Sequence, residues 1–315
     1  MKLGFAPCVA ALAAALLSAC GYVGPPQPPT LDIPATIADF RAGEYGNNIE
    51  IAFTMPATTT EALPLENVRS VELRIRENSA QEKIIMLPVP IPGPVTNDVP
   101  VRDWIGKSIT LSVRVTGPKG KASDWSNPAS LIVIPPLPAP STPNPQNVEG
   151  GVELSWTGPG PRYRIFRAEA DGQPAPLADT ERSPYLDIST SYGTRYRYMV
   201  QTIAADNQWS VVSEAAAITP LDIFPPAIPE GLSAVPTPQS IELGWTRNTE
   251  TDFRGYNVSR SVDGAPFQKV AELIEAPTYS DSKIEPGKKY RYTVSAVDLT
   301  GNESPQSAST EATAQ

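Results

Sequence analysis

Apolar and polar residues alternate in short segments throughout the C-terminal part of the chain. Residues 240–245, 255–260 and 290–298 each carry apolar or aromatic side chains at nearly every second position. An alternation with a period of two is typical of a β-strand with one face buried and the other in water. Turn residues at Gly287 and Gly301 bound the last of these segments. Strands separated by turns at this spacing predict a β-sandwich.

The same succession of strands occurs in the middle of the chain. Residues 152–156, 163–167 and 196–202 alternate in the same way and in the same order. This copy belongs to a predicted domain of residues 146–220, and the C-terminal copy belongs to one of residues 221–315. Two sandwiches in tandem are therefore expected in the second half of the chain.

A more diverged copy is predicted over residues 35–135. Its strands are expected at residues 49–53, 71–75 and 109–115, which alternate well. Residues 87–100 hold five prolines, and proline offers no amide hydrogen to a strand ladder. We therefore expect this stretch to be an irregular connection instead of regular strands.

Particular residues at fixed places in the strands give these copies a family likeness. The C-terminal copy resembles a bacterial fibronectin type III domain, in which Trp245 matches the B-strand tryptophan, Tyr256 the C-strand tyrosine and Tyr290 the F-strand corner tyrosine. Trp156 and Tyr196 match the first and last of these in the middle copy. The resemblance implies an all-β chain of three tandem immunoglobulin-like (fibronectin type III) β-sandwiches joined by Pro-rich linkers.

The N-terminal copy departs from the family pattern at two places. Phe53 stands where the other copies have tryptophan, and Ile109 replaces the corner tyrosine. A corner hydrogen bond through a tyrosine hydroxyl is therefore not expected in this copy. The resemblance implies core positions for six side chains: Phe53, Trp156, Tyr196, Trp245, Tyr256 and Tyr290.

Residues 1–19 have the pattern of an export signal. An apolar run over residues 3–17 follows Lys2 and is shorter than the roughly 20 residues that a membrane-spanning helix needs. The run leads to Leu-Ser-Ala-Cys, ending at Cys20, which resembles the lipobox of bacterial lipoprotein precursors. The resemblance implies cleavage before Cys20, attachment of a diacylglycerol with palmitate-type acyl chains to its sulfur and, because Gly21 follows instead of aspartate, transport to the outer membrane. An uncleaved anchor, or ordinary cleavage with Cys20 incidental, are the alternatives.

Proline-rich stretches separate the predicted parts. Residues 20–34 and 136–145 favour extended polyproline geometry, which makes the first a tether and the second a semi-rigid linker. The opening of the tether also resembles small outer-membrane lipoproteins that begin Cys-Gly-x-Lys-Gly-Pro and assist envelope assembly, with Val23 in place of their lysine.

The composition argues against several classes of function. The chain of 315 residues has a formal net charge of -9 and no histidine. Binding to nucleic acid is driven by basic faces that neutralise phosphates, so we expect no nucleic-acid partner. Without histidine there is no Ser-His-Asp triad and no HExxH zinc site. We therefore expect no catalytic residues, no cofactor and no metal, although Ser-Lys and carboxylate-pair chemistry stay open.

Two Trp-Ser dipeptides follow the turn after the F strand, at matching places in the first and second copies. Alternation points Arg114 and Arg197 outward on those F strands. We therefore expect Trp125 to stack on Arg114 and Trp209 on Arg197 as cation–π pairs. The arrangement resembles the Trp-Ser element of cytokine-receptor fibronectin domains, where it is mainly structural. The alternative is an exposed aromatic platform for a sugar ring or a partner chain.

Six acidic residues gather in the third copy. Calcium favours several hard oxygen ligands, whereas aspartate at β-turns is also explained by turn chemistry alone. Calcium binding therefore stays an open alternative to the expectation of no metal. The six residues are Asp222, Glu250, Asp252, Asp281, Asp298 and Glu303.

The sequence as a whole indicates a non-catalytic, lipid-anchored protein of the cell envelope, at the outer membrane, that serves as a protein-binding or spacer module. Its expected partners are the membrane, through the lipid, and an unidentified envelope protein or polymer. The fold alone names no partner. Two alternatives stay open: an accessory protein that binds carbohydrate or another polymer, and an envelope assembly factor that acts through its N-terminal tether.

Overall fold

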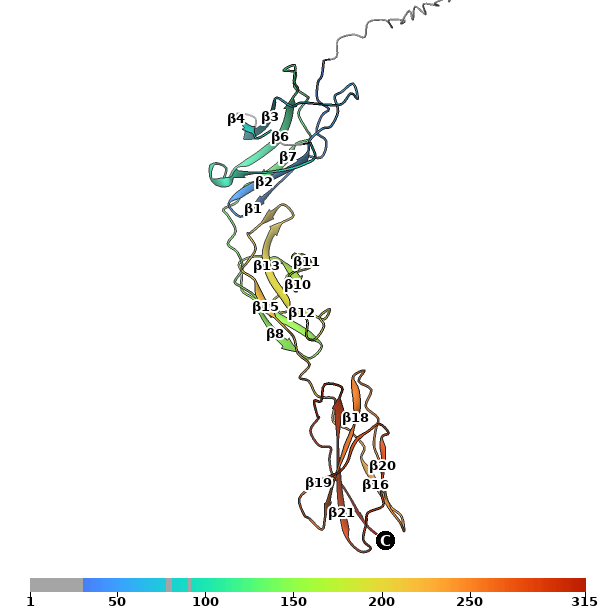
Figure 1. The fold of residues 1–315 in the computed structure, drawn as a ribbon. Coiled ribbons are helices and arrows are strands. Elements are labelled where there is room, and N and C mark those ends of the chain that lie inside the picture. The colour runs from blue at the N-terminus through green and yellow to red at the C-terminus, as the bar shows by residue number, and fades with distance from the viewer. Residues whose placement is uncertain (1–30, 78–80, 90–91) are drawn as a thin grey trace, which may run out of the picture. The chain divides into compact units, whose positions relative to one another are not determined.

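The computed structural model describes residues 31–77, 81–89 and 92–315 and consists almost entirely of β-strands and their connections (Figure 1). The predicted signal peptide, the lipidated Cys20 and most of the predicted tether lie outside these residues. Within the described ranges, no helix has the length and apolar character needed to cross a membrane.

The described chain divides into two compact units. The first ends at Pro136 and includes Asn207–Trp209, and the second consists of Leu137–Asp206 and Ser210–Gln315. The first unit has one apolar core, and the second has two separate ones. The domain boundaries expected from the sequence stay a prediction.

The first unit is a sandwich of two antiparallel sheets. One sheet has the order β4-β3-β6-β7, and in the other β2 lies between β1 and β5. Between the sheets, alternate residues such as Leu73, Ile75 and Leu111 are fully buried, as a period of two requires. The elements are β1 (Arg41–Tyr45), β2 (Asn48–Thr54), β3 (Ser70–Glu77), β4 (Gln81–Leu87), β5 (Pro94–Pro100), the 3-10 helix η1 (Val101–Asp103), β6 (Ser108–Thr116), β7 (Ala129–Ile132) and, in parallel with β1, β14 (Gln208–Trp209).

Strand β5 corrects the expectation that residues 87–100 form an irregular connection. The strand pairs with β2 from Pro94 to Pro100 and buries Val95 and Val99. Its prolines stand at its two ends, and among the described residues it pairs only with β2, so the missing amide hydrogens fall where an edge strand tolerates them.

The first core of the second unit lies between a three-stranded and a four-stranded sheet. The sheet β12-β9-β8 faces strands in which β10 lies between β11 and β13, and β15 pairs with β13. The edge strand β8 begins at Asn144, inside the predicted linker of residues 136–145. The strands are β8 (Asn144–Val148), β9 (Gly151–Ser155), β10 (Arg162–Glu169), β11 (Ala175–Thr180), β12 (Tyr185–Asp187), β13 (Tyr196–Ala205) and β15 (Ala216–Ile218).

The C-terminal core has the same plan. A three-stranded sheet, β16-β17-β20, packs on a four-stranded sheet, β19-β18-β21-β22. The strands are β16 (Ser233–Pro236), β17 (Ile241–Gly244), β18 (Phe253–Val262), β19 (Gln268–Ile274), β20 (Thr278–Asp281), β21 (Lys289–Asp298) and β22 (Thr310–Thr313).

The fold predicted from the sequence is confirmed. A three-stranded and a four-stranded antiparallel sheet packed face to face, with alternate side chains turned inward, form a fibronectin type III-like sandwich. The six aromatic residues that the resemblance places in the cores are all buried: Phe53, Trp156, Tyr196, Trp245, Tyr256 and Tyr290.

Candidate functional site

The Trp125 side chain lies on the outer face of the sheet β4-β3-β6-β7. The guanidinium carbon of Arg114, from β6, is 4.6 Å from the centre of the ring, and that of Arg74, from β3, is 4.0 Å from it. Glu72 holds Arg114, since its Oε2 accepts from Nε at 2.9 Å and from Nη2 at 2.7 Å. The structure therefore places Arg114 at Trp125, where alternation put it. It adds Arg74, which the sequence pattern did not single out.

Trp209 has a different environment. It belongs to β14, which pairs with β1 in the first unit, and its ring lies against Gly43, where a Cβ would stand 2.6 Å from the ring carbon Cζ3. Arg197 lies in β13 and donates from Nη2 to the carbonyl oxygen of Gly172 at 2.9 Å. In place of the predicted cation–π pair, the two side chains have separate partners.

Pairs of serines three residues apart recur in all three sandwiches. In each, the hydroxyl of the first serine accepts from a backbone amide of the F strand, which is β6, β13 or β21. The hydroxyl of the second serine accepts from the amide two residues earlier in the same strand. Each hydroxyl also donates to the carbonyl oxygen of the residue after it. The pairs are Ser123 and Ser126, Ser210 and Ser213, and Ser304 and Ser307.

The position of each tryptophan relative to the serine pair shows that the two Trp-Ser dipeptides are not equivalent. Trp125 precedes the second serine of its pair, whereas Trp209 precedes the first. The two tryptophans therefore stand three positions apart in the repeat, and the match between them expected from the sequence was wrong. The repeated element is the serine pair, which supplies acceptors to amides of β6, β13 and β21 beyond the residues at which these strands pair with β7, β15 and β22.

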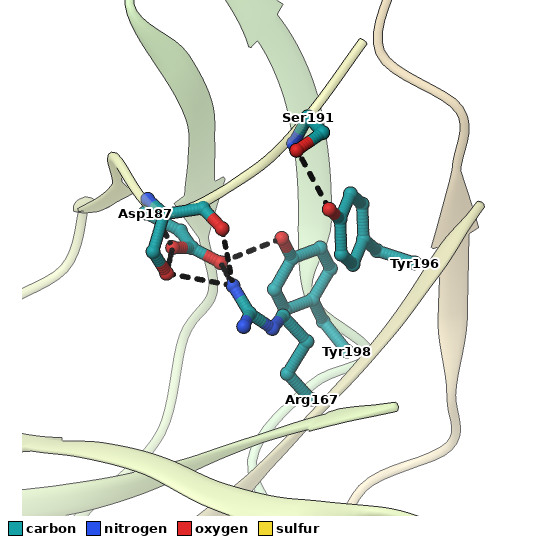
Figure 2. A network of polar contacts seen from close by, with 6 residues as sticks. Arg167, Asp187, Ser191, Tyr196 and Tyr198 are labelled. Atoms are coloured by element: carbon teal, nitrogen blue, oxygen red, sulfur yellow. Dashed lines mark hydrogen bonds and ion pairs between the residues drawn. The ribbon is translucent and has the colours of Figure 1, made fainter. Parts of the chain in front are cut away.

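A charged network is buried in the second sandwich (Figure 2). Asp187, the last residue of β12, is 2% exposed. Its Oδ2 accepts from Nη1 of Arg167 and from the Tyr198 hydroxyl, both at 2.8 Å. Its Oδ1 accepts from the amide and the hydroxyl of Ser189 at 3.0 and 2.6 Å. Donors on both oxygens are the condition for keeping a carboxylate out of water.

The electrostatics of this network favour a structural role. Burial disfavours the charged form of Asp187, but hydrogen bonds from Ser189, Arg167 and Tyr198 outweigh it and hold the pKa of the carboxyl below its usual value. Burial and the hydrogen bond to Asp187 raise the pKa of the Tyr198 hydroxyl far above its usual value. Tyr198 stays a donor and Asp187 an acceptor, so neither is poised to transfer a proton near neutral pH.

Two tyrosines close the loops that precede β13 and β21. The Tyr196 hydroxyl accepts from the backbone amide of Ser191 at 2.9 Å (Figure 2), and the Tyr290 hydroxyl accepts from that of Glu285 at 2.7 Å. In both cases the amide lies a few residues upstream in the loop, which is the tyrosine-corner arrangement.

The third sandwich repeats the charged network. Asp281 is 1% exposed and accepts from Nη1 of Arg260 at 3.1 Å (Oδ1) and 2.9 Å (Oδ2). The Tyr292 hydroxyl donates to its Oδ2 at 2.8 Å. This arrangement was not predicted from the sequence, where Asp281 stands only among the candidate calcium ligands. The signal that could have found it is the tripeptide Tyr-Arg-Tyr, which occurs at the same place in both copies.

The first unit has apolar side chains at all three places of this network. By strand register, Ile75 faces Leu111 as the arginine faces the tyrosine in the other sandwiches, and Val99 on β5 takes the place of the aspartate. All three are buried. The replacement is complete, because one charged member left alone would be buried without a partner.

Three acidic side chains of the third sandwich come together. Carboxylate oxygens of Asp222, Asp252 and Asp298 lie within 4.8 Å of one another. Asp298 is buried, which opposes ionisation, but hydrogen bonds from Asn302 and Thr300 hold the pKa of its carboxyl below the usual value. Three hard oxygens are fewer than the six to eight that calcium takes. The other acidic residues have partners of their own, which are the Ala227 amide for Glu250, Arg260 for Asp281 and the Ser295 hydroxyl for Glu303.

Comparison with known proteins gives partial matches, and no family model matches the chain. The chain is 35% identical over 92 residues to an amylopullulanase of Thermoanaerobacterium saccharolyticum, a match that covers 29% of this chain and 7% of that protein. It is 26% identical over 193 residues to exoglucanase B of Cellulomonas fimi, which covers 57% of this chain and 17% of that protein. The chain thus spans a small part of the curated relatives it matches.

Two solved structures are similar to this chain, one over a part of it and the other over most of it. An Fn3-like protein from Clostridium thermocellum is 36% identical, with a TM-score of 0.25 and coverage of 28% of this chain and 92% of that one. The FN1–FN3 domains of chicken CNTN1 are 14% identical, with a TM-score of 0.30 and coverage of 90% and 99%.

Proposed function

We propose that this chain is a non-catalytic protein of the cell envelope, lipid-anchored at Cys20, whose sandwiches serve as protein-binding or spacer modules. The observation that carries the proposal is that the side chains that could form a site are engaged in contacts with one another. The Trp125 ring carries two guanidinium groups, and the buried carboxylates of Asp187 and Asp281 accept hydrogen bonds from the hydroxyls of Tyr198 and Tyr292. Groups engaged in this way stabilise a module, and few side chains are left that could act in catalysis.

The relatives and the N-terminal pattern support the same proposal. The matched region is 7% of the amylopullulanase and 17% of the exoglucanase, which is consistent with a non-catalytic module of a larger enzyme. The Leu-Ser-Ala-Cys pattern at Cys20 supports an anchor at the membrane. A module held at a membrane and without chemistry of its own acts by positioning or by binding.

Affinity capture from envelope membranes tests the proposal. The full chain is tagged at its C-terminus and compared with the Cys20→Ala variant, which removes the lipid-bearing sulfur. We expect a defined envelope protein to co-purify with the lipidated chain and to be lost or strongly reduced with the variant. Equal capture by both forms, or retention of glycan alone by both, contradicts the proposal.

A carbohydrate-binding accessory protein is the second candidate, because two of the relatives are named as enzymes that act on glucans. Its weakness is the lack of a flat aromatic platform at the expected places, since the ring of Trp125 carries guanidinium groups and that of Trp209 lies on Gly43. Sedimentation of the purified chain with insoluble α- and β-glucans tests it. We expect the chain to stay in solution. Sedimentation that Trp125→Ala or Trp209→Ala abolishes would establish this second candidate.

A further inference from the structure

The outer face of the sheet β4-β3-β6-β7 has a regular layout that the strand register fixes. Arg74 stands at its centre, opposite Ile84 on β4 and opposite Ser112 on β6. Directly opposed residues of antiparallel strands point to the same face with their Cβ atoms about 5 Å apart. Glu72 is in the same way opposed to Met86 on β4. The face is therefore a small array of charged and aliphatic side chains around one arginine.

The arginines on either side of Arg74 have carboxylate partners. Nε of Arg76 lies 2.7 Å from Oε2 of Glu82, and Nη2 of Arg114 lies 2.7 Å from Oε2 of Glu72. Within the described residues, Arg74 has no such partner: its Nε donates to the Ser112 hydroxyl at 3.1 Å. Of the three arginines on this face, Arg74 is therefore the one whose guanidinium forms no ion pair with a carboxylate of the described residues.

The Arg74 guanidinium is also fixed in orientation. The Ser112 hydrogen bond and the Trp125 ring, 4.0 Å from its central carbon, together hold the plane of the group. Burial and the like charges of Arg76 and Arg114 lower the pKa of Arg74, and the carboxylate of Glu82 opposes this effect only in part. The terminal nitrogens form a fork, which matches the two oxygens of a carboxylate. A group held in this way loses little freedom when it binds an anion.

Aliphatic side chains flank this fork. Ile84 is 43% exposed and Met86 is 58% exposed, although both lie in the regular strand β4. In the described sheet β4 pairs only with β3, so these side chains border an open strand edge. Arginine, tryptophan and methionine beside exposed aliphatic area are the residue types enriched where proteins bind proteins.

We propose that this face, centred on Arg74 and bordered by Ile84 and Met86, is a docking surface for a protein segment that presents a carboxylate flanked by aliphatic side chains. The inference rests on the proposed protein-binding function and names the chemistry of the partner. The carboxylate pairs with the Arg74 fork, and the aliphatic side chains cover Ile84 and Met86. A hydroxyl-rich glycan fits less well, because its rings would meet aliphatic side chains and a tryptophan whose ring already carries guanidinium groups.

A phage-displayed random dodecapeptide library is the probe that tests the proposal. Selection on the full chain is expected to enrich peptides with Asp or Glu next to aliphatic residues. A synthetic copy of an enriched peptide is expected to bind the Arg74→Gln variant at least about tenfold more weakly, because a charge-assisted hydrogen bond is lost. Arg74→Lys keeps the charge without the fork, and an intermediate affinity is expected.

The matched control is Arg102→Gln, which removes the same charge from an arginine of the same unit whose side chain is 84% exposed. Its affinity for the peptide is expected to equal that of the unaltered chain. Ile84→Thr keeps a β-branched residue in β4 and is expected to weaken binding on its own. Unchanged thermal melts of all variants show that a loss of binding is not a loss of fold.

Two outcomes overturn the proposal. One is that enriched peptides lack acidic residues or bind Arg74→Gln as well as the unaltered chain. The other is that an oligomer of a uronic acid binds in an Arg74-dependent way while no peptide does, which assigns the face to an acidic polysaccharide. If membrane capture still yields an envelope protein whose binding does not depend on Arg74, the proposed function stands and only the assignment of this docking face is wrong.

Discussion

Tyr198 shows what a single hydroxyl contributes inside these sandwiches. It is fully buried, and it donates one of the hydrogen bonds that keep the Asp187 carboxylate charged out of water. Tyr198→Phe keeps the ring and removes the donor, so we expect the sandwich to lose about 1–3 kcal/mol of stability. Thermal denaturation followed by circular dichroism measures the effect.

The control for this variant is Tyr185→Phe. Tyr185 packs against the same core but has no hydrogen-bond partner for its hydroxyl among the described residues. Removing that hydroxyl is expected to change stability by no more than a few tenths of a kcal/mol, within the range of neutral substitutions. Equal effects of the two substitutions would show that the Asp187 hydrogen bond does not matter.

Acid stability depends on the same aspartate. The pKa of Asp187 is lowered in the folded chain, whereas an unfolded aspartate titrates near pH 3.9. Its contribution is therefore complete above about pH 4 and is lost as the pH falls through the lower folded value. Ser189→Ala removes one donor to the carboxylate and is expected to weaken the acid dependence. Urea midpoints measured from about pH 6 downward test this, and parallel curves for the two proteins would contradict it.

Among the elements, β6, β13 and β21 are each followed by a serine pair whose hydroxyls accept hydrogen bonds from amides of the strand, as the carbonyl groups of a partner strand would. The Ser213 hydroxyl accepts from the Val200 amide at 3.0 Å and donates to the Glu214 carbonyl oxygen at 2.9 Å. Ser213→Ala leaves a buried amide without an acceptor, and we expect a loss of about 1–3 kcal/mol.

Ser282→Ala is the control for the serine pair. Its side chain is exposed and has no hydrogen-bond partner among the described residues, so no measurable loss is expected. Denaturant unfolding of both variants gives the comparison. A Ser213→Ala chain as stable as the control would mean that the Val200 amide finds water or another acceptor.

Alternation predicted the strands because it reports which face of each strand is buried. It did not predict β5, since the prolines of residues 87–100 argue against a strand, and Pro94 and Pro100 are tolerated because they end a strand at the edge of its sheet. Register was also out of reach. The Trp-Ser dipeptides at Trp125 and Trp209 look alike in sequence, but hydrogen bonding sets them three positions apart.

The candidate site was the least predictable part of the chain. In the sequence, Asp187 and Asp281 resemble ordinary turn residues. Their networks could not be predicted, because only the fold brings an arginine and a tyrosine from neighbouring strands to each of them. Arg74 gave no signal either, since an outward arginine in a strand is ordinary. Its distinction is that Arg76 and Arg114 form ion pairs, whereas Arg74 has no carboxylate partner in the part of the chain that the structure describes.

At the scale of the whole molecule, the same sandwich is built with two kinds of interior. The second and third sandwiches bury an aspartate, an arginine and a tyrosine together, whereas the first unit has Val99, Ile75 and Leu111 at the corresponding places. Leu111→Tyr alone would place one polar member among apolar neighbours. We expect it to destabilise the first unit by more than about 1 kcal/mol, as measured by thermal denaturation.

Capture from envelope membranes tests most directly the proposed role of this chain as a non-catalytic protein-binding module. Envelope membranes are divided into two portions, one digested with protease and one with glycan-degrading enzymes. After both treatments are quenched, each portion is offered to the tagged full chain. We expect specific capture to be lost after proteolysis and to survive glycan digestion. Capture that survives proteolysis but is lost with the glycans would contradict it and would favour the polymer-binding function.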